Sequence, residues 1–414
     1  MYPQKELNYI RDLAKKTAEH AYSDTTNKCR KLWASHNSLQ PGRPLFHVRS
    51  IPGWDFMKSS DYFCSDTYLR NLEYKFLIDQ YRMKLADDYI TEPFMTIRAA
   101  VKTNPDGVWG LSSKLGEKST DFGAAAFNPS IINESDIERL NVADYEIDEI
   151  ETSRQYNKMH EIFHDILKID IDRQGALCSI WNSDISTMLA RLRGLEQIML
   201  DVYDRPEWFH KLLSFMRDNI LKNIDQTQAA GGFALINHEN QSMPYSEELA
   251  PPKVNAHGVN TSELWGFFAS QEYTTFSTPH FDEFMLQYQI PIIERYGLSA
   301  YGCCEDLTHK ISVLRRIKNL RRIAVTPWAN TKLCAEQIGK DYVLSWRPNP
   351  SDAVSRGIDE TFIRSELREV FDIFDSNSCV FDITLKDVET VAGDPNSIIQ
   401  WCSVVRDEIN KRYC

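Results

Sequence analysis

The sequence predicts an α/β protein, a (β/α)8 barrel of the TIM type preceded by a mostly helical N-terminal extension. From about residue 160, helices with clear boundaries alternate with short strands. The strands are continuously apolar, which is typical of parallel strands buried on both faces. No Gly-rich dinucleotide fingerprint follows any strand, so a barrel is favoured over a doubly wound sheet. We assign residues 1–124 to the extension or cap and residues 125–414 to the barrel.

The predicted elements follow in chain order. The extension contains the helical segment "NLEYKFLIDQYRMKLADDYI". In the barrel, "DRPEWFHKLLSFMRDNILKNIDQTQAAGG" predicts a helix with Pro206 in its first turn and Gly231 after its last. "STPHFDEFMLQYQIPIIERYG" predicts another, ending at Gly297 and kinked by Pro291. The predicted strands are "GFALINHE", "LSAYGCCE", "RRIAVTPWAN", "DYVLSWRPN" and "SCVFDITL".

Composition limits the classes of partner and compartment. The chain has 414 residues and a net charge of −12, which argues against nucleic acid or an anionic membrane as the main partner. The first residues, "MYPQKELNYIRDLAKK", lack the apolar core of a signal peptide, and no run is long enough to span a bilayer. We therefore expect a cytoplasmic protein whose nine cysteines are reduced.

Chemistry is expected where the strands end, because a parallel barrel gathers these ends on one rim. The stretch "LSAYGCCEDLTHK" places two adjacent cysteines and two acids directly after an apolar strand. Adjacent residues of a strand face opposite sides, so only one of Cys303 and Cys304 is expected to face the site. Cys379, in "DSNSC", is assigned to the same rim. We predict that Cys303 and Cys379 meet at one metal ion.

Zinc suits such a pair because thiolates bind it tightly and an open position can hold a substrate group. A zinc-bound thiol loses its proton near neutral pH and becomes a good methyl acceptor. His238 and Glu305 are candidates for the remaining ligands, or for groups that orient a ligand. Each also has a structural alternative: Cys379 as a buried strand cysteine, and His238 as a hydrogen-bonded core histidine.

Several phrases also resemble a known family when taken in order: "NPSIINESDIERL", "ARLRGLEQIMLDVYDRPEWFHKLL", "QAAGGFALIN", "YGCCED" and "SCVFDITLKDVETVAGDPNSIIQW". Over roughly residues 125–411 the chain resembles the uroporphyrinogen decarboxylase superfamily, whose fold is a (β/α)8 barrel. The branch nearest to it resembles the methylcobamide-dependent methyltransferases. The Arg- and Gly-rich segment with which the decarboxylases grip tetrapyrrole carboxylates is absent, so true uroporphyrinogen decarboxylation is not expected.

The resemblance also implies a ligand set. In the methyltransferase branch, a His-x-Cys pair and a distant Cys bind zinc. Here the pair is Tyr301-Gly302-Cys303, and Cys379 matches the distant Cys. Because Tyr301 stands in the His position, the third ligand is His238, Glu305, Glu272 or Tyr301 itself, or the site binds no metal.

Our first hypothesis is a zinc-dependent methyltransferase. It moves a methyl group between a small methylated or carboxylated substrate and a corrinoid carried by a partner protein, since the chain lacks the "DxHxxG" loop of a cobalamin module. The assigned residues are metal ligands Cys303, Cys379 and His238, catalytic residues Glu239, Tyr301 and Glu305, and substrate-binding residues Glu272, Trp328, Asn330 and Arg347.

Two alternatives keep the barrel. The first is a metal-free lyase or decarboxylase, with Arg347 binding a substrate carboxylate and His238 or Glu239 moving protons. The second is a non-catalytic ligand-binding barrel, since fold does not fix function. In each case the extension is expected to act as a lid or as the contact of a possible homodimer.

Overall fold

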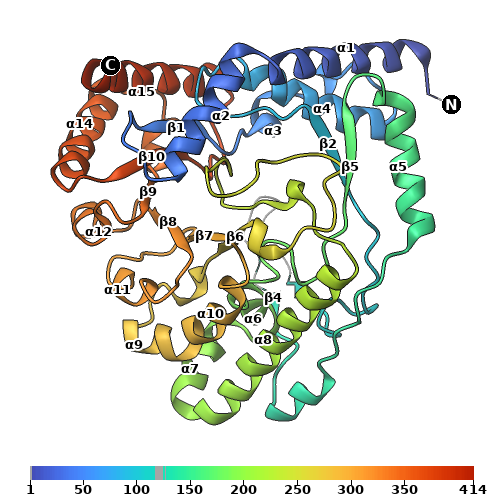
Figure 1. The fold of residues 1–414 in the computed structure, drawn as a ribbon, viewed down its shortest axis with the longest axis vertical. Coiled ribbons are helices and arrows are strands. Elements are labelled where there is room, and N and C mark those ends of the chain that lie inside the picture. The colour runs from blue at the N-terminus through green and yellow to red at the C-terminus, as the bar shows by residue number, and fades with distance from the viewer. Residues whose placement is uncertain (1, 117–124, 126) are drawn as a thin grey trace.

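The protein is an α/β protein organised around a six-stranded parallel sheet, as the computed structural model of residues 2–116, 125 and 127–414 describes it (Figure 1). The strand order is β1-β10-β9-β8-β7-β6, and every neighbouring pair is parallel. The strands are, in that order, Leu45–Val48, Val380–Leu385, Val343–Trp346, Leu320–Val325, Leu298–Tyr301 and Trp265–Phe268. A second parallel sheet pairs β2 (Phe94–Arg98) with β5 (Lys168–Asp172). The predicted α/β class is confirmed.

Helices connect successive strands of the large sheet and cover one of its faces. Those that follow β7, β8, β9 and β10 are α11 (Ile311–Leu314), α12 (Thr331–Ile338), α13 (Pro350–Ala353) with α14 (Glu360–Ser376), and α15 (Asn396–Tyr413). Figure 1 shows α11, α12 and α14 in a row along the outer side of these strands. Strand-helix-strand units that place consecutive parallel strands side by side bring all their C-terminal ends to one edge.

The two predicted barrel helices are confirmed, with one local difference. Helix α8 (Pro206–Ala229) begins at its proline. The second forms α9 (Thr278–Phe281), the π-helical η6 (Asp282–Leu286) and α10 (Gln287–Ile293), which contains Pro291. The π-helical turn lies before the α-helical segment that contains Pro291, and the proline itself leaves the Gln287 carbonyl without an N–H four residues later.

The N-terminal segment is built into both sheets. Its remaining helices, with those that surround β5, are α1 (Gln4–Ala21), α2 (Asp24–Asn37), α3 (Gly53–Phe56), α4 (Thr67–Arg82), α5 (Glu149–Phe163), α6 (Ser186–Arg193) and α7 (Leu195–Asp204). Strand β1 pairs with β10, and β2 pairs with β5. Residues 1–124, predicted as an N-terminal extension or cap, thus contribute a strand to each parallel sheet, and the predicted boundary at residue 124 falls outside the described residues.

One predicted strand is a short 3-10 helix instead. In "GFALINHE", η3 (Leu235–Asn237) replaces the strand, because the Asn237 side-chain oxygen accepts a hydrogen bond from the Ala234 N–H at 2.8 Å and competes with strand pairing. The Asn237 amide donates to Asp172 at 2.9 Å, and the Glu239 N–H donates to the Trp265 carbonyl at 3.2 Å. The segment therefore links the end of β5 to the start of β6.

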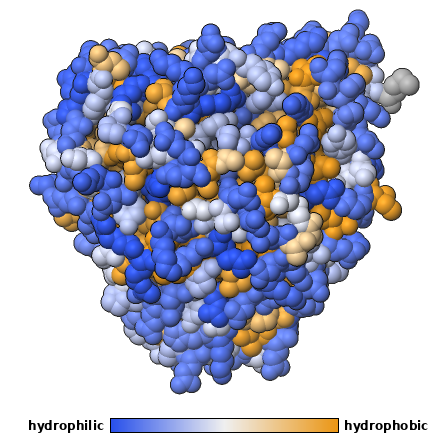
Figure 2. Space-filling view, in the orientation of Figure 1, coloured by the Kyte–Doolittle hydropathy of each residue, from blue (hydrophilic) through white to orange (hydrophobic). Residues whose placement is uncertain are grey.

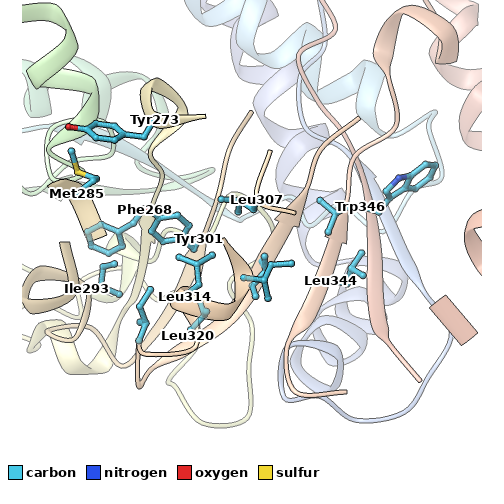
Figure 3. Close-up of a cluster of buried hydrophobic side chains, with 14 of the residues drawn as sticks. Phe268, Tyr273, Met285, Ile293, Tyr301, Leu307, Leu314, Leu320, Leu344 and Trp346 are labelled. Carbon is cyan, nitrogen blue, oxygen red and sulfur yellow. The ribbon is translucent and has the colours of Figure 1, made fainter. Parts of the chain in front are cut away.

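The two faces of the large sheet are buried in different ways. One face carries apolar side chains that pack against the helices. Figure 3 shows Phe268 and Tyr301 side by side in this layer, with Leu314 and Leu320 nearby and Leu344 farther along the sheet, below Trp346. The other face carries a buried ion pair between Arg322 and Asp382 at 2.8 Å. These two charged side chains can lie inside the protein because each one is paired with the other.

The visible surface is mixed in character. Hydrophilic side chains cover most of the face in Figure 2, and apolar ones show between them across its middle. Single exposed apolar residues are normal on a folded protein.

Candidate functional site

The site is centred on the two adjacent cysteines that follow β7. The strand ends at Tyr301, and Gly302 then takes φ +103°, a conformation that favours glycine. After this turn, Cys303 Sγ and Cys304 Sγ lie 3.6 Å apart. The expectation that they face opposite sides is wrong, because the strand has already ended. Cys303 is 4% exposed, whereas Cys304 is exposed.

Lys386 is the cation beside both sulfur atoms. It is the first residue after β10, and its Nζ lies 3.1 Å from Cys303 Sγ and 3.4 Å from Cys304 Sγ. The Gln241 amide also donates to Cys303 Sγ, at 3.6 Å. The hydrogen bond from the Cys304 thiol and the charges of Lys386 and Arg347 lower the pKa of Cys303, although burial opposes this. Cys303 is therefore a thiolate near neutral pH.

Two predicted site residues hold the loop that carries this thiolate. The Glu305 carboxylate accepts the N–H of Cys303 at 2.7 Å and that of Ser270 at 2.8 Å. The buried Arg347 donates to the carbonyl of Cys303, and to that of Gly302 at 3.2 Å. Glu305, predicted as catalytic, and Arg347, predicted to bind substrate, thus both position Cys303.

Two acids complete the surroundings, the buried Asp184 and the half-buried Glu272. Ser186 Oγ donates to Glu272 Oε2 at 2.7 Å, and Thr187 Oγ1 donates to Asp184 at 2.7 Å. Burial raises the pKa of both Glu272 and Asp184, and the charge of Glu305 raises each further. Their protonated forms persist to higher pH than in water, so they can donate protons. Glu272 was predicted at the site; Asp184 was not.

Two cavities are lined by residues that surround the site, although Cys303 itself lines neither. One, of about 250 Å³, is lined by Glu239 and His238; the other, of about 840 Å³, is lined by Glu272. Phe267, which lines the smaller cavity, belongs with Cys303 to a cluster against which Trp181 packs. The thiolate therefore lies behind an aromatic wall of the smaller cavity.

The backbone around the site is strained. Trp181, Ile185, Gln241 and Asp387 have φ of +69°, +64°, +59° and +56°, a region that residues other than glycine rarely adopt. For the β-branched Ile185 such a φ is an outlier. Strain of this kind persists where the surrounding structure enforces a particular arrangement, and it gathers at functional sites.

His238 lies beside the smaller cavity without reaching the thiolate through any hydrogen bond. Its Nδ1 accepts the Trp265 N–H at 3.1 Å, and its Nε2 has no partner among the described residues. Burial lowers the pKa of His238 to about 4, so the ring is neutral. Glu239, also predicted at the site, accepts the N–H of Gln241 at 2.8 Å and so supports a residue that contacts Cys303.

Other predicted site residues lie elsewhere. The Tyr301 hydroxyl bonds to Ser270 and Gln289, each at 2.7 Å, within the apolar layer against α10. Trp328 is 72% exposed, and Asn330 caps α12 by accepting the Leu333 N–H. The fold accounts for Tyr301 and Asn330 without substrate, and Trp328 lies on the surface.

Cys379 lies at the opposite end of the sheet. It precedes β10, whereas Cys303 follows β7, and the strands run parallel. Its Sγ lies 3.7 Å from the Ala335 carbonyl oxygen. The prediction that Cys303 and Cys379 share a metal ion is therefore wrong, because residues before and after parallel strands lie on different edges.

The predicted zinc ligands do not fit a zinc ion. Within residues 2–116, 125 and 127–414, no three His, Cys, Asp or Glu side chains are placed to hold a metal. The Lys386 ammonium lies against both sulfur atoms that would otherwise be ligands. We therefore derive no chemistry from zinc.

The sequence contained a signal for the missed lysine. In "FDITLKD" the apolar run ends directly before Lys386, so Lys386 follows its strand as Cys303 does. Cys379, in "DSNSC", precedes the same strand. Gln241 and Asp184 gave no comparable signal, because they lie on irregular segments.

The fold and the site define an α/β protein with a buried, ion-paired thiolate at the C-terminal ends of its parallel strands. A scan against protein-family models and a search of the curated proteins both find no match to this chain. Among the described residues, no helix is long and apolar enough to cross a membrane.

Proposed function

We propose that the protein is a methyltransferase in which the Cys303 thiolate, without a metal, carries the methyl group between a small substrate and a corrinoid on a partner protein. The observation that carries the proposal is the 3.1 Å contact between Cys303 Sγ and Lys386 Nζ. The corrinoid and its partner protein rest on the sequence resemblance alone.

We also infer that the two parallel sheets close into a (β/α)8 barrel. The hydrogen bonds of Asn237 and Glu239 to Asp172 and Trp265 span the interval between β5 and β6. Lys386 reaches Cys303 although β8 and β9 lie between their strands, as expected of a curved sheet. A barrel supports the proposal because its C-terminal rim collects groups from several strands.

In the first step, the thiolate attacks the methyl carbon of a substrate methyl bonded to oxygen, sulfur or nitrogen. The S–C bond forms, the bond from carbon to the heteroatom breaks, and the heteroatom keeps its electron pair. For an ether, the leaving oxygen takes up the proton of Glu272 or Asp184, whose raised pKa values keep a proton available.

In the second step, the S–CH3 bond breaks and the methyl group passes to the acceptor, while sulfur keeps the electron pair. A sulfur whose thiolate is stabilised by a cation is a better leaving group than an ordinary thiolate. Lys386 and Gln241 therefore assist both steps, because the thiolate is reactant in one and product in the other.

The experiment uses mass spectrometry of the whole chain after incubation with methyl donors, namely an aryl methyl ether, a methylsulfonium compound and methylcobalamin. We expect one donor to add a single methyl group to Cys303, and none to modify the Cys303→Ser variant. Cys379→Ser is the matched control and should be methylated like the wild type. Absence of a Cys303 adduct with every donor would reject the thiolate as methyl carrier.

A second function, a metal-free lyase, is favoured by a different observation. His238 is neutral, its buried Nε2 has no partner among the described residues, and it lines the smaller cavity with Glu239. A neutral imidazole next to a carboxylate can move protons on a bound acid. If the protein is a lyase, His238→Gln should abolish its reaction with a carboxylated substrate, whereas Cys303→Ser should leave that reaction intact.

A further inference from the structure

We propose that Cys303 and Cys304 form a reversible redox site, in which a hydroperoxide oxidises Cys303 and Cys304 then closes a disulfide with it. The modification itself does not require methyl transfer. Only its consequence, the loss of the methyl-accepting thiolate, rests on the proposed function.

The geometry already brings together the parts of such a site. The two sulfur atoms lie 3.6 Å apart, nearly in contact, because the turn at Gly302 directs both side chains to one side. Cys303 is buried against Lys386, and Cys304 is exposed. A reactive thiolate beside an accessible second thiol is the arrangement of a peroxide-sensitive cysteine with its resolving partner.

The surrounding charges assign different roles to the two thiols. The pKa of Cys304 is raised by its hydrogen bond with Cys303 and by the negative charge on Cys303, so it keeps its proton. Lys386 favours negative charge on Cys303. Cys303 is therefore the atom that attacks the peroxide, and Cys304 supplies the proton and the second sulfur.

The reaction balances in two steps. The Cys303 thiolate attacks one peroxide oxygen, the O–O bond breaks, and sulfenic acid forms at Cys303 while the other oxygen leaves as hydroxide and takes up a proton. Cys304 sulfur then attacks Cys303 sulfur, the S–OH bond breaks, and water leaves with the Cys304 proton. Two thiols are oxidised to one disulfide, and one hydroperoxide is reduced.

Reversibility follows from the adjacency of the two residues. Neighbouring Cα atoms are about 3.8 Å apart, shorter than the usual Cα separation in a disulfide, and a strained disulfide is more easily reduced. A thiol reductant therefore restores the site. The disulfide also protects Cys303 from irreversible oxidation to sulfinic acid.

The test treats the full chain with hydrogen peroxide without substrate, blocks remaining thiols with N-ethylmaleimide, and identifies the modified peptides by mass spectrometry. We expect the peptide with both cysteines to lose two hydrogens and to escape labelling, so that two of the nine thiols disappear. Dithiothreitol should restore both.

Two variants provide the controls. Cys304→Ser replaces an exposed thiol and should block the disulfide, leaving Cys303 to oxidise to sulfenic and then sulfinic acid. Cys414→Ser removes another exposed thiol and should behave like the wild type.

Sulfinic acid at Cys303 of the wild type with Cys304 still labelled, or a disulfide that joins either cysteine to Cys414, would overturn the proposal. Because no methyl donor is present, these results are independent of whether Cys303 accepts a methyl group.

Discussion

Replacing Lys386 with methionine tests the electrostatic basis of the site, because it removes the charge and keeps the length of the side chain. Lys386 Nζ lies 3.1 Å from Cys303 Sγ, and at an effective dielectric constant of about 20 this pair attracts by about 5 kcal/mol. Burial of both groups opposes the attraction. We therefore expect Lys386→Met to raise the pKa of Cys303 by about 1 to 3 pH units, or roughly 1.4 to 4 kcal/mol.

The assay is the rate of alkylation by iodoacetamide as a function of pH. Only the thiolate reacts, so the rate rises with pH through the pKa of the thiol. Because that pKa is lowered in the wild type, Cys303 should react at pH values below those at which an ordinary cysteine thiol ionises. A Cys304→Ser background keeps a hydroxyl donor near Cys303 and removes the second reactive thiol of the peptide.

Lys386→Arg is the matched control, since it keeps the charge and should leave the pH profile close to that of the wild type. In Lys386→Met the profile should move to higher pH, and the rate near pH 7 should fall. An unchanged profile in Lys386→Met, with the fold intact by circular dichroism, would refute the assignment of Lys386 as the group that stabilises the thiolate.

Three further predictions concern stability and the corrected placement of a cysteine. Asp382→Asn leaves Arg322 as a buried cation without its charged partner and should lower the free energy of unfolding by about 3 to 5 kcal/mol, measured with urea. Burial raises the pKa of Glu366 to about 7, so ionising this side chain in the folded protein costs stability, and the full cost is present above that pH. Glu366→Gln should therefore add about 1 to 3 kcal/mol to the free energy of unfolding at pH 8 and little at pH 5. An equal gain at both pH values would contradict ionisation of Glu366 as the cause. Cys379→Ala should lower the free energy of unfolding by about 1 kcal/mol without changing the alkylation rate of Cys303. A slower alkylation rate would show that Cys379 and Cys303 interact after all.

The sequence predicted those elements whose signals are local. Strands β7, β8, β9 and β10 are apolar runs with clear ends, and α8 begins at Pro206 as its sequence predicts. The "GFALINHE" strand failed because one side chain, Asn237, takes the hydrogen bond that a strand would have used. Strand β1 was missed because it lies in a segment without the helix-strand rhythm, and its pairing with β10 joins residues far apart in the chain.

The site was predicted in part for the same reason. The position of Cys303 at a strand end followed from one apolar run and its turn, and Glu305 came with it. The partner of Cys303 from β10 depended on the direction of that strand: the predicted Cys379 precedes the strand, and Lys386, which follows it, was missed. Chain direction decides this point, because a parallel sheet places the residues that follow their strands at one edge and those that precede them at the other.

The choice of lysine over a metal changes what the sulfur can do. The Lys386 ammonium has three N–H donors, and it lies 3.1 Å from Cys303 Sγ, 3.4 Å from Cys304 Sγ and 2.9 Å from Asp387 Oδ2, so all three have acceptors. A hydrogen bond stabilises negative charge on Cys303 without occupying the sulfur as a metal bond would. The thiolate thus keeps lone pairs for a carbon or oxygen electrophile, which is why one arrangement supports both methyl acceptance and reaction with peroxide.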